Sequence, residues 1–133
     1  MSKLKQWLKL IVSYPKLGFH DTSYDTYWRS RGLDSKLKLN SFQKKRADLT
    51  LRHLEKNSII LDVGCGNGAL LSYISDVKQM KKLIGIDISK KALAFAEENN
   101  IEIVLGDISK IETLNKLPAA DYILMFEVIE HFP

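Results

Sequence analysis

Residues 58–70 read Ser-Ile-Ile-Leu-Asp-Val-Gly-Cys-Gly-Asn-Gly-Ala-Leu, and they carry the strongest structural signal in the chain. Its first half is a run of β-favouring apolar residues, which predicts a buried strand. Its second half places Gly64, Gly66 and Gly68 at alternate positions, and an apolar helical stretch begins at Ala69. Strand, glycine turn and helix in this order let backbone N–H groups approach a bound ligand closely. The stretch therefore predicts a ligand-binding turn after the first strand of a sheet.

Each glycine of this turn has an expected role. Gly64 permits the tight turn, Gly66 keeps a Cβ out of the ligand's path, and Gly68 lets the helix pack closely on the strand. The same residues also fit the dinucleotide form G-x-G-x-x-A, with Ala69 at its last position. The turn alone leaves the ligand class open, so the downstream sequence has to decide it.

The downstream sequence alternates strands with helices. Three further apolar stretches are predicted strands: residues 83–87, 101–107 and 121–126. Helices are expected between the strands: residues 69–77, residues 90–99 and a short segment before Pro118. Ser89 is the expected N-cap of one helix, and Ser109-x-x-Glu112 is a capping-box pattern for the short one. This alternation predicts an α/β fold with a parallel sheet and right-handed crossovers.

Residues 1–57 are expected to form a basic helical arm ahead of a ligand-binding domain at residues 58–133. Residues 1–19 are amphipathic at helical spacing, which favours a lid or packing helix, with a membrane surface as the alternative. Residues 40–56 read as a basic helix with Asn40 or Ser41 as N-cap. Between them, four residues share one helical face: Tyr24, Tyr27, Trp28 and Arg31. That face suits closing over a flat, carboxylate-bearing ligand, and it suits docking on a core equally well.

Composition fits one globular domain, with 133 residues of which 45% are hydrophobic and 27% charged. Residues 1–57 hold 13 lysines and arginines against 5 acids, and residues 58–133 hold 7 against 11. The basic part is expected to be a solvated surface, although phosphate-bearing substrates, nucleic acid or anionic membranes are alternatives. The one cysteine, Cys65, cannot form an internal disulfide, which favours the cytoplasm and a space-filling role. No transmembrane segment is predicted.

A polar residue stands at the end of each later strand, and the carboxyl ends of parallel strands bind ligands. Asp87 ends the second strand, Asp107 ends the third and Glu127 follows the fourth. Asp87 lies roughly 20 residues beyond the glycine turn, where an acid can accept from both ribose hydroxyls. Asp107 can accept from an adenine amino group, with the Ile108 N–H near a ring nitrogen. The pattern predicts a ligand with a free ribose at this edge.

Four segments together resemble, in order and spacing, the motifs of class I S-adenosylmethionine-dependent methyltransferases. They are Leu61-Asp-Val-Gly-Cys-Gly-Asn-Gly68, Ile84-Gly-Ile-Asp-Ile-Ser89, Gly106-Asp107-Ile108 and Phe126-Glu-Val-Ile-Glu-His131. The resemblance covers about residues 58–133. It implies a Rossmann-like parallel sheet, in which the four strands take the order 3-2-1-4, and S-adenosyl-L-methionine as the cofactor.

The resemblance implies roles at the methionine end of the cofactor. Asp62 and residues 64–66 (Gly64, Cys65 and Gly66) would lie along the methionine portion. The aromatic stretch upstream looks like the N-terminal lid of small-molecule members, which makes Trp28 and Arg31 candidates near the same end. A carboxylate before the glycine turn is useful near the ammonium of methionine and unhelpful near a pyrophosphate. Asp62 therefore counts against a dinucleotide oxidoreductase.

At the other end, Asp87 would bind the ribose and Ile88 would lie against the adenine. Asp107, with Ile108 beside it, would bind the adenine amino group, and the turn at Phe126 would face the sulfonium. These too are roles that the resemblance implies.

The implied reaction is an in-line methyl transfer, in which positioning and desolvation supply much of the rate. A hydroxyl acceptor needs a general base, and His131 is the first candidate and Glu127 the second. His131 alternatively only fixes the loop after the fourth strand. Glu127, Glu130 and His131 also resemble the metal-binding motif of RNA 3′-terminal 2′-O-methyltransferases. Because Phe132 stands where those proteins can have a further histidine, no metal is predicted.

The family's sheet has seven strands, and this sequence supplies four. We therefore expect that the chain is truncated after the fourth strand, or that another chain covers its open apolar edge. The leading hypothesis is a methyltransferase acting on a hydroxyl of a small molecule such as a sugar. The alternatives are a dinucleotide oxidoreductase, a non-catalytic S-adenosylmethionine-binding module, and an RNA methyltransferase that uses the basic arm.

Overall fold

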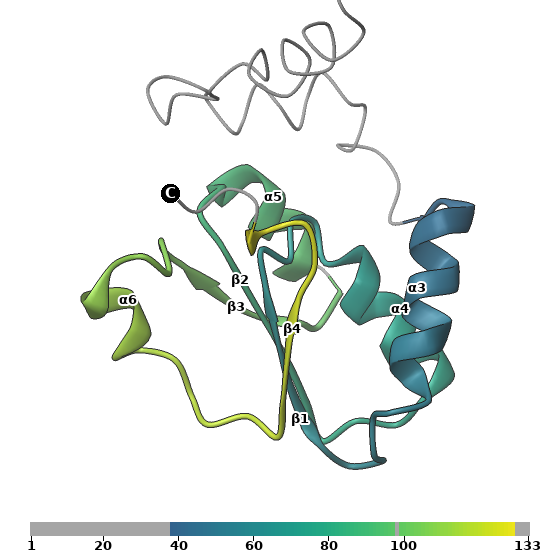
Figure 1. Ribbon diagram of the computed structural model, residues 1–133. Coiled ribbons are helices and arrows are strands. Elements are labelled where there is room, and N and C mark those ends of the chain that lie inside the picture. The colour runs from purple at the N-terminus through teal and green to yellow at the C-terminus, as the bar shows by residue number, and fades with distance from the viewer. Residues whose placement is uncertain (1–37, 98, 130–133) are drawn as a thin grey trace, which may run out of the picture.

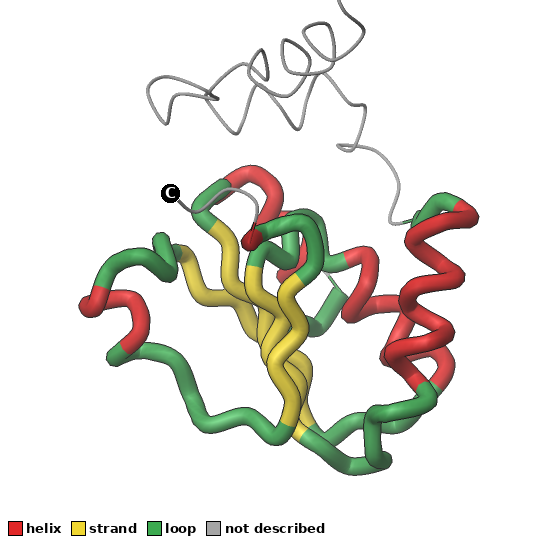
Figure 2. The backbone as a smooth tube through the Cα atoms, viewed as in Figure 1, coloured by secondary structure: helices red, strands yellow, loops and turns green. Residues whose placement is uncertain are grey.

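The computed structural model describes residues 38–97 and 99–129 of the chain. In this part strands and helices alternate along the chain, and the strands form one parallel sheet (Figures 1 and 2). The elements are α3 (Ser41–Leu51), β1 (Ile59–Val63), α4 (Ala69–Val77), β2 (Lys82–Asp87), α5 (Lys90–Glu97), β3 (Glu102–Leu105), α6 (Ile111–Leu114) and β4 (Tyr122–Met125). The predicted alternation of strands and helices is confirmed.

The sheet has four parallel strands in the order β3-β2-β1-β4, as predicted. Near the end of β1, Val63 pairs with Ile86 on one side and Met125 on the other. At the end of β2, Asp87 pairs with Leu105. The carboxyl ends of all four strands therefore lie along one edge, where the polar residues follow them.

Side chains alternate between the two faces of the sheet along each strand. Those on one face form a hydrophobic core with helices α3, α4 and α5. This core consists of Leu51, Leu54, Ile60, Cys65, Leu71, Ile74, Leu93, Ala96, Ile101 and Leu124. A second core on the other face contains Leu61, Val63, Ile84 and Ile86, packed by partly buried residues of the loops around α6. In Figure 1, α3 and α4 lie on one side of the sheet and α6 lies on the other.

Helix α3 begins with the predicted cap. The Asn40 side chain accepts from the Gln43 N–H at 2.8 Å, and the Gln43 side chain accepts from the Asn40 N–H at 3.0 Å, which is a capping box. The helix ends at Leu51, earlier than predicted, because the chain turns there to bury Leu54. The Lys78 ammonium stabilises this turn by donating to the carbonyls of Leu51 and Leu54 at 2.5 and 2.6 Å.

The predicted capping box at Ser109 and Glu112 is wrong. The N-cap of α6 is Lys110, which makes no side-chain cap bond. Ser109 instead donates its N–H and its hydroxyl to Asp107 Oδ1 at 2.9 and 2.7 Å. Serine and aspartate side chains compete in this way for nearby backbone groups. The same turn ends β3 at Leu105, two residues before the predicted end of that strand.

Within residues 38–97 and 99–129, no helix is long and apolar enough to cross a membrane. The segments expected over residues 1–34 lie outside the described residues. The predicted domain boundary after residue 57 remains a prediction. Helix α3 precedes this position in the chain and packs against the core of the sheet.

Candidate functional site at the carboxyl edge of the sheet

The glycine turn after β1 is held against the end of β2. The N–H groups of Gly64 and Cys65 donate to the Ile86 carbonyl at 2.8 and 3.1 Å. Gly64, Gly66 and Gly68 have φ values of 73°, 55° and 77°. Residues with a Cβ are strained in this left-handed region, so the turn needs its glycines.

Two of these glycines also admit neighbours that the sequence did not identify. A Cβ on Gly64 would overlap the Val128 side chain, which follows β4. A Cβ on Gly68 would lie 2.8 Å from Ile101 Cδ1 and 2.9 Å from Ala96 Cβ. The absence of a side chain at Gly68 thus leaves room for α5 and for Ile101, the residue before β3, whereas the sequence predicted close packing on the preceding strand.

Cys65 fills space beside β2. Its side chain is buried, and a Cβ on Gly85 would lie 2.5 Å from its sulfur. Burial and the charges of Asp62 and Asp87 raise the pKa of the thiol above its usual range. A thiol held neutral in this way is a poor nucleophile.

Two buried carboxylates, Asp62 on β1 and Asp87 at the end of β2, interact electrostatically. Burial, followed by the Asp87 charge, raises the pKa of Asp62 from 3.8 to about 8, and the Arg46 cation partly opposes this rise. Burial also raises the pKa of Asp87, although Asp87 accepts backbone hydrogen bonds that act in the opposite direction. Burial and the electrostatic repulsion between the two acids therefore disfavour a negative charge on both of them at once.

Asp87 ties the glycine turn to the start of α5. Its Oδ2 accepts from the Gly66 N–H and its Oδ1 from the Ser89 N–H, both at 2.9 Å. The Ser89 hydroxyl accepts from the Ala92 N–H at 3.3 Å, which confirms the predicted cap. The carboxylate is thus held in one orientation, with lone pairs left for further donors.

The residues predicted to surround an adenosine meet at the ends of β2 and β3. The Gly106 N–H donates to the Asp87 carbonyl at 3.0 Å, which brings the two strand ends together. Ile88 is 50% exposed, whereas Ile108 is half-buried against the second core. The hydrogen bonds from Ser109 lower the pKa of Asp107, so that carboxyl is ionised near neutral pH.

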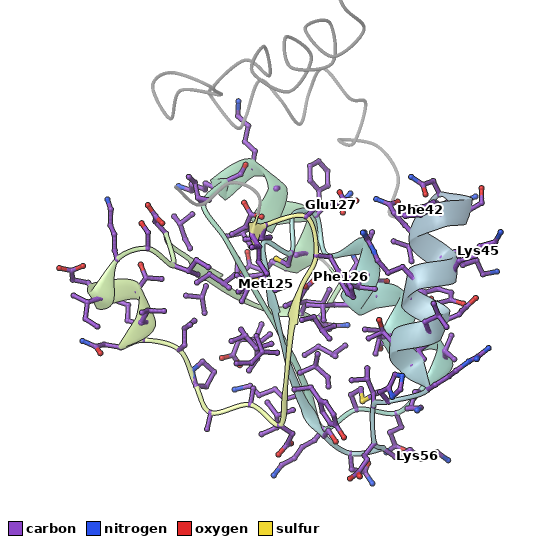
Figure 3. All side chains as sticks on the ribbon, viewed as in Figure 1. Phe42, Lys45, Lys56, Met125, Phe126 and Glu127 are labelled. Atoms are coloured by element: carbon purple, nitrogen blue, oxygen red, sulfur yellow. The ribbon has the colours of Figure 1, made fainter. Side chains whose placement is uncertain are left out.

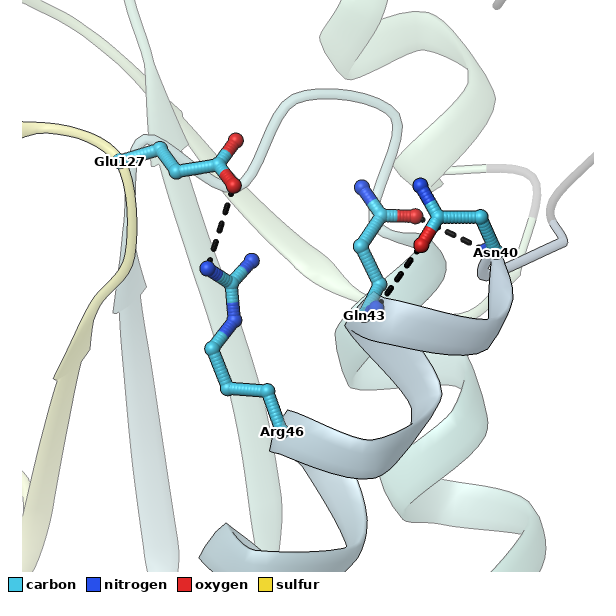
Figure 4. Close-up of polar contacts among 4 residues, drawn as sticks. All are labelled: Asn40, Gln43, Arg46 and Glu127. Atoms are coloured by element: carbon cyan, nitrogen blue, oxygen red, sulfur yellow. Dashed lines mark hydrogen bonds and ion pairs between the residues drawn. The ribbon is translucent and has the colours of Figure 1, made fainter.

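The loop after β4 contains a cluster that the sequence did not predict. Arg46 of α3 donates from Nη1 to Glu127 Oε1 at 3.1 Å (Figure 4). Its guanidinium carbon lies 4.6 Å from the centroid of the Phe126 ring. Figure 3 shows Phe126 and Glu127 at the end of β4, with Phe42 on α3 across from them.

Arg46 was missed because it stands in the run Lys44-Lys45-Arg46, which is typical of a solvated helix face. No local pattern separates it from the two lysines, because only the packing of α3 directs it toward β4. The other missed contact, Val128 over Gly64, also joins distant parts of the chain.

Three predicted site residues lie outside the described residues: Trp28, Arg31 and His131. Glu130, which was considered only as part of a metal-binding motif, also lies outside them. Glu127, the second candidate base, is described and lies at the carboxyl edge. No metal-binding group of three or more His, Cys, Asp or Glu residues occurs in the part of the chain that the structure describes.

Residues 54–133 match the model of a family described as a methyltransferase domain. A mitochondrial ubiquinone biosynthesis O-methyltransferase of Candida albicans is 33% identical over 108 residues, which are 72% of this chain and 31% of that protein. Other curated matches are named as N-methyltransferases, a putative viral methyltransferase and a probable ribosomal RNA methyltransferase. The chain spans between 21% and 31% of the length of these relatives.

Solved structures share the fold. The PH0226 protein from Pyrococcus horikoshii matches with a TM-score of 0.61 at 23% identity, over 80% of this chain and 53% of that one. Coclaurine N-methyltransferase, solved with N-methylheliamine and SAH, matches with a TM-score of 0.57 at 26% identity. That match covers 65% of this chain and 28% of the enzyme.

Proposed function

Because this chain belongs to the methyltransferase domain family, we propose that its carboxyl edge binds S-adenosyl-L-methionine for methyl transfer to a small molecule. The observation that carries the proposal is the convergence of three carboxylates and the glycine turn at one edge of the sheet. The carboxylates are those of Asp62, Asp87 and Asp107, and each stands at or near the end of a different strand.

The residues present fit this cofactor. Burial and the neighbouring Asp87 disfavour the ionised form of Asp62. A cation beside Asp62 would stabilise that form by electrostatic attraction. The ammonium of the methionine portion is such a cation. Asp87 is fixed by two backbone donors and retains lone pairs for ribose hydroxyls. The exposed Ile88 side chain offers an apolar surface for the adenine, and the ionised Asp107 offers an acceptor for its amino group.

The cofactor supplies an electrophilic methyl group on a positively charged sulfur. The protein contributes orientation and a partly desolvated setting, which are the main sources of rate in such a transfer. Phe126 and Glu127 belong to the loop after β4, which packs on the glycine turn through Val128. We therefore assign both residues to the side of the site nearest the reacting methyl group. Glu127 can accept the proton of a hydroxyl acceptor if its carboxylate is released from the ion pair with Arg46. His131 remains the first candidate for the general base.

The acceptor class is also a proposal. We retain a hydroxyl of a small molecule, such as a sugar, as the acceptor. An amine is the second candidate, because curated matches include proteins named as N-methyltransferases. An RNA acceptor and a non-catalytic binding module remain alternatives, and a cytoplasmic location remains the expected one.

The first experiment is isothermal titration of S-adenosylmethionine and S-adenosylhomocysteine into the full chain and its Asp87→Ala and Asp87→Asn variants. We expect binding by the parent chain and a loss of at least about tenfold in affinity for both variants, since each removes a charged acceptor. Asp76→Asn, an exposed acid on α4, is the matched control and should bind like the parent.

Circular dichroism shows whether each variant is folded. A folded parent chain that binds neither compound would contradict the proposal. NADH is titrated in parallel, and tight NADH binding would favour an oxidoreductase instead.

A further inference from the structure

The Arg46 side chain connects α3 with two successive residues of the loop after β4. Its Nη1 lies 3.1 Å from Glu127 Oε1, and the guanidinium carbon lies 4.6 Å from the Phe126 ring centroid. The same carbon lies 5.6 Å from the ring centroid of Phe42, one helical turn earlier on α3. The guanidinium therefore contacts a carboxylate and two aromatic rings, a combination that its flat, delocalised cation favours.

The backbone of this loop is strained at the residue that Arg46 binds. Glu127 has a φ of 56°, in the left-handed region that residues with a Cβ rarely adopt. Such a conformation persists where the surrounding structure holds it. Two contacts hold it here: the ion pair from Arg46, and the packing of the next residue, Val128, over Gly64. The loop is thus attached both to α3 and to the glycine turn.

The neighbouring basic residues of α3 do not share this position. Lys44 lies 6.0 Å from the ring centroid of Tyr73 on α4, and Lys45 is exposed. The Arg46 side chain is the less accessible member of its own pair, with 28% exposure against 61% for Glu127. An exposed ion pair by itself adds little stability, so the significance of this contact lies in where it places the loop.

We propose that Arg46 is a positioning residue that fixes Phe126 and Glu127 beside the methyl-transfer site. The inference rests on the proposed function, because that function places these two residues next to the reacting group. Arg46 acts through the loop and does not bind the cofactor itself. The role belongs to arginine in particular, because lysine keeps the charge but lacks the flat face that stacks on the rings.

The first test needs no ligand. Backbone NMR chemical shifts of residues 126–129 report whether Glu127 occupies the left-handed conformation. We expect Arg46→Ala to shift these signals toward an averaged loop, Arg46→Lys to restore them in part, and Lys45→Ala to leave them unchanged. Unchanged signals in folded Arg46→Ala would overturn the proposal.

The second test is a double-mutant cycle on S-adenosylhomocysteine affinity with Arg46→Ala, Glu127→Ala and the double variant. Arg46→Ala should weaken binding by about fivefold, the scale of an ion pair and a cation–π contact. The same change should cost less in the Glu127→Ala background, because its main partner is already absent. Equal losses in both backgrounds would mean that Arg46 acts independently of Glu127, which contradicts the proposal.

The two tests separate the inference from the proposed function. Failure of the parent chain to bind S-adenosylhomocysteine would count against the proposed function, while the NMR measurement would still decide the role of Arg46. Normal binding with no effect of Arg46→Ala on either readout would remove this inference and leave the proposed function intact.

Discussion

Asp62 stands two residues before the glycine turn and is only 3% exposed. The sequence predicted a useful negative charge there, next to a cationic part of the cofactor. The structure adds that burial and Asp87 hold its pKa near 8. The residue is therefore largely protonated near neutral pH, until a cation lowers its pKa. A buried acid in this state is typical of a site adapted to a ligand and contributes to pH dependence.

The raised pKa predicts that the free energy of unfolding falls as the pH rises from about 4 to about 8. The folded state holds its proton at Asp62 more tightly than the unfolded state does. This stabilisation is complete below pH 3.8 and is lost as the pH rises through about 8. The decrease is at most about 1.4 kcal/mol per pH unit for one group. Urea unfolding at several pH values measures it.

Asp62→Asn should make this pH dependence shallower and should leave the variant more stable than the parent at pH 8. The remaining slope comes from Asp87, whose pKa is also raised. Asp76→Asn, an exposed change, serves as the control. A slope in Asp62→Asn equal to that of the parent would show that Asp62 is not the titrating group.

At the scale of elements, the turn after β1 and the loop after β4 form one unit. Two separate features require glycine at position 64: its φ is 73°, and a side chain there would overlap Val128. The loop reaches this position because β1 and β4 are neighbours in register, with Val63 opposite Met125. A substitution in either segment should therefore change the packing of the other.

Gly64→Ala should destabilise the chain by about 2–3 kcal/mol, from backbone strain together with overlap. In a Val128→Ala background the overlap is removed and only the strain remains, so the cost should be smaller. Chemical unfolding of the parent, both single variants and the double variant measures this coupling. Additive costs would mean that the glycine serves the backbone alone.

On the scale of the whole molecule, β4 is an edge strand in the sheet that the structure describes. Its side chains alternate, with Leu124 buried against the helical layer and Ile123 64% exposed on the other face. Exposed apolar edge strands promote pairing with other chains. We therefore retain the proposal that this edge associates with a further strand, either from a second copy or from another polypeptide.

Ile123→Lys should reduce any concentration-dependent association of the chain, because a charge on an edge strand disfavours pairing. Sedimentation velocity over a range of concentrations measures this effect, and Ile111→Lys, on exposed α6, is the matched control. The thermal midpoint should change little, because the replaced side chain is mostly exposed. A parent chain that remains monomeric, with the β4 amides protected from exchange, would contradict the proposal.

The strand–turn–helix unit, the alternation of strands and helices, and the acids at the strand ends were all predictable from the order of the amino acids. These features are local: glycine spacing, apolar periodicity and a helix cap such as Asn40 are encoded within a few neighbouring residues. The strand order followed from the resemblance of four motifs to one family. Where local hydrogen bonds compete, as at Ser109, the sequence pattern alone favoured the wrong partner.

Contacts between groups that are far apart in the chain depend on how the helices and strands pack. Arg46 and Glu127 are 81 positions apart, and their contact depends on how α3 packs beside the sheet. The overlap of Gly64 with Val128 and the pKa of Asp62 likewise depend on burial and on partners from other strands. Charge, exposure and contact at these positions are properties of the packed molecule, because no local periodicity in the chain specifies them.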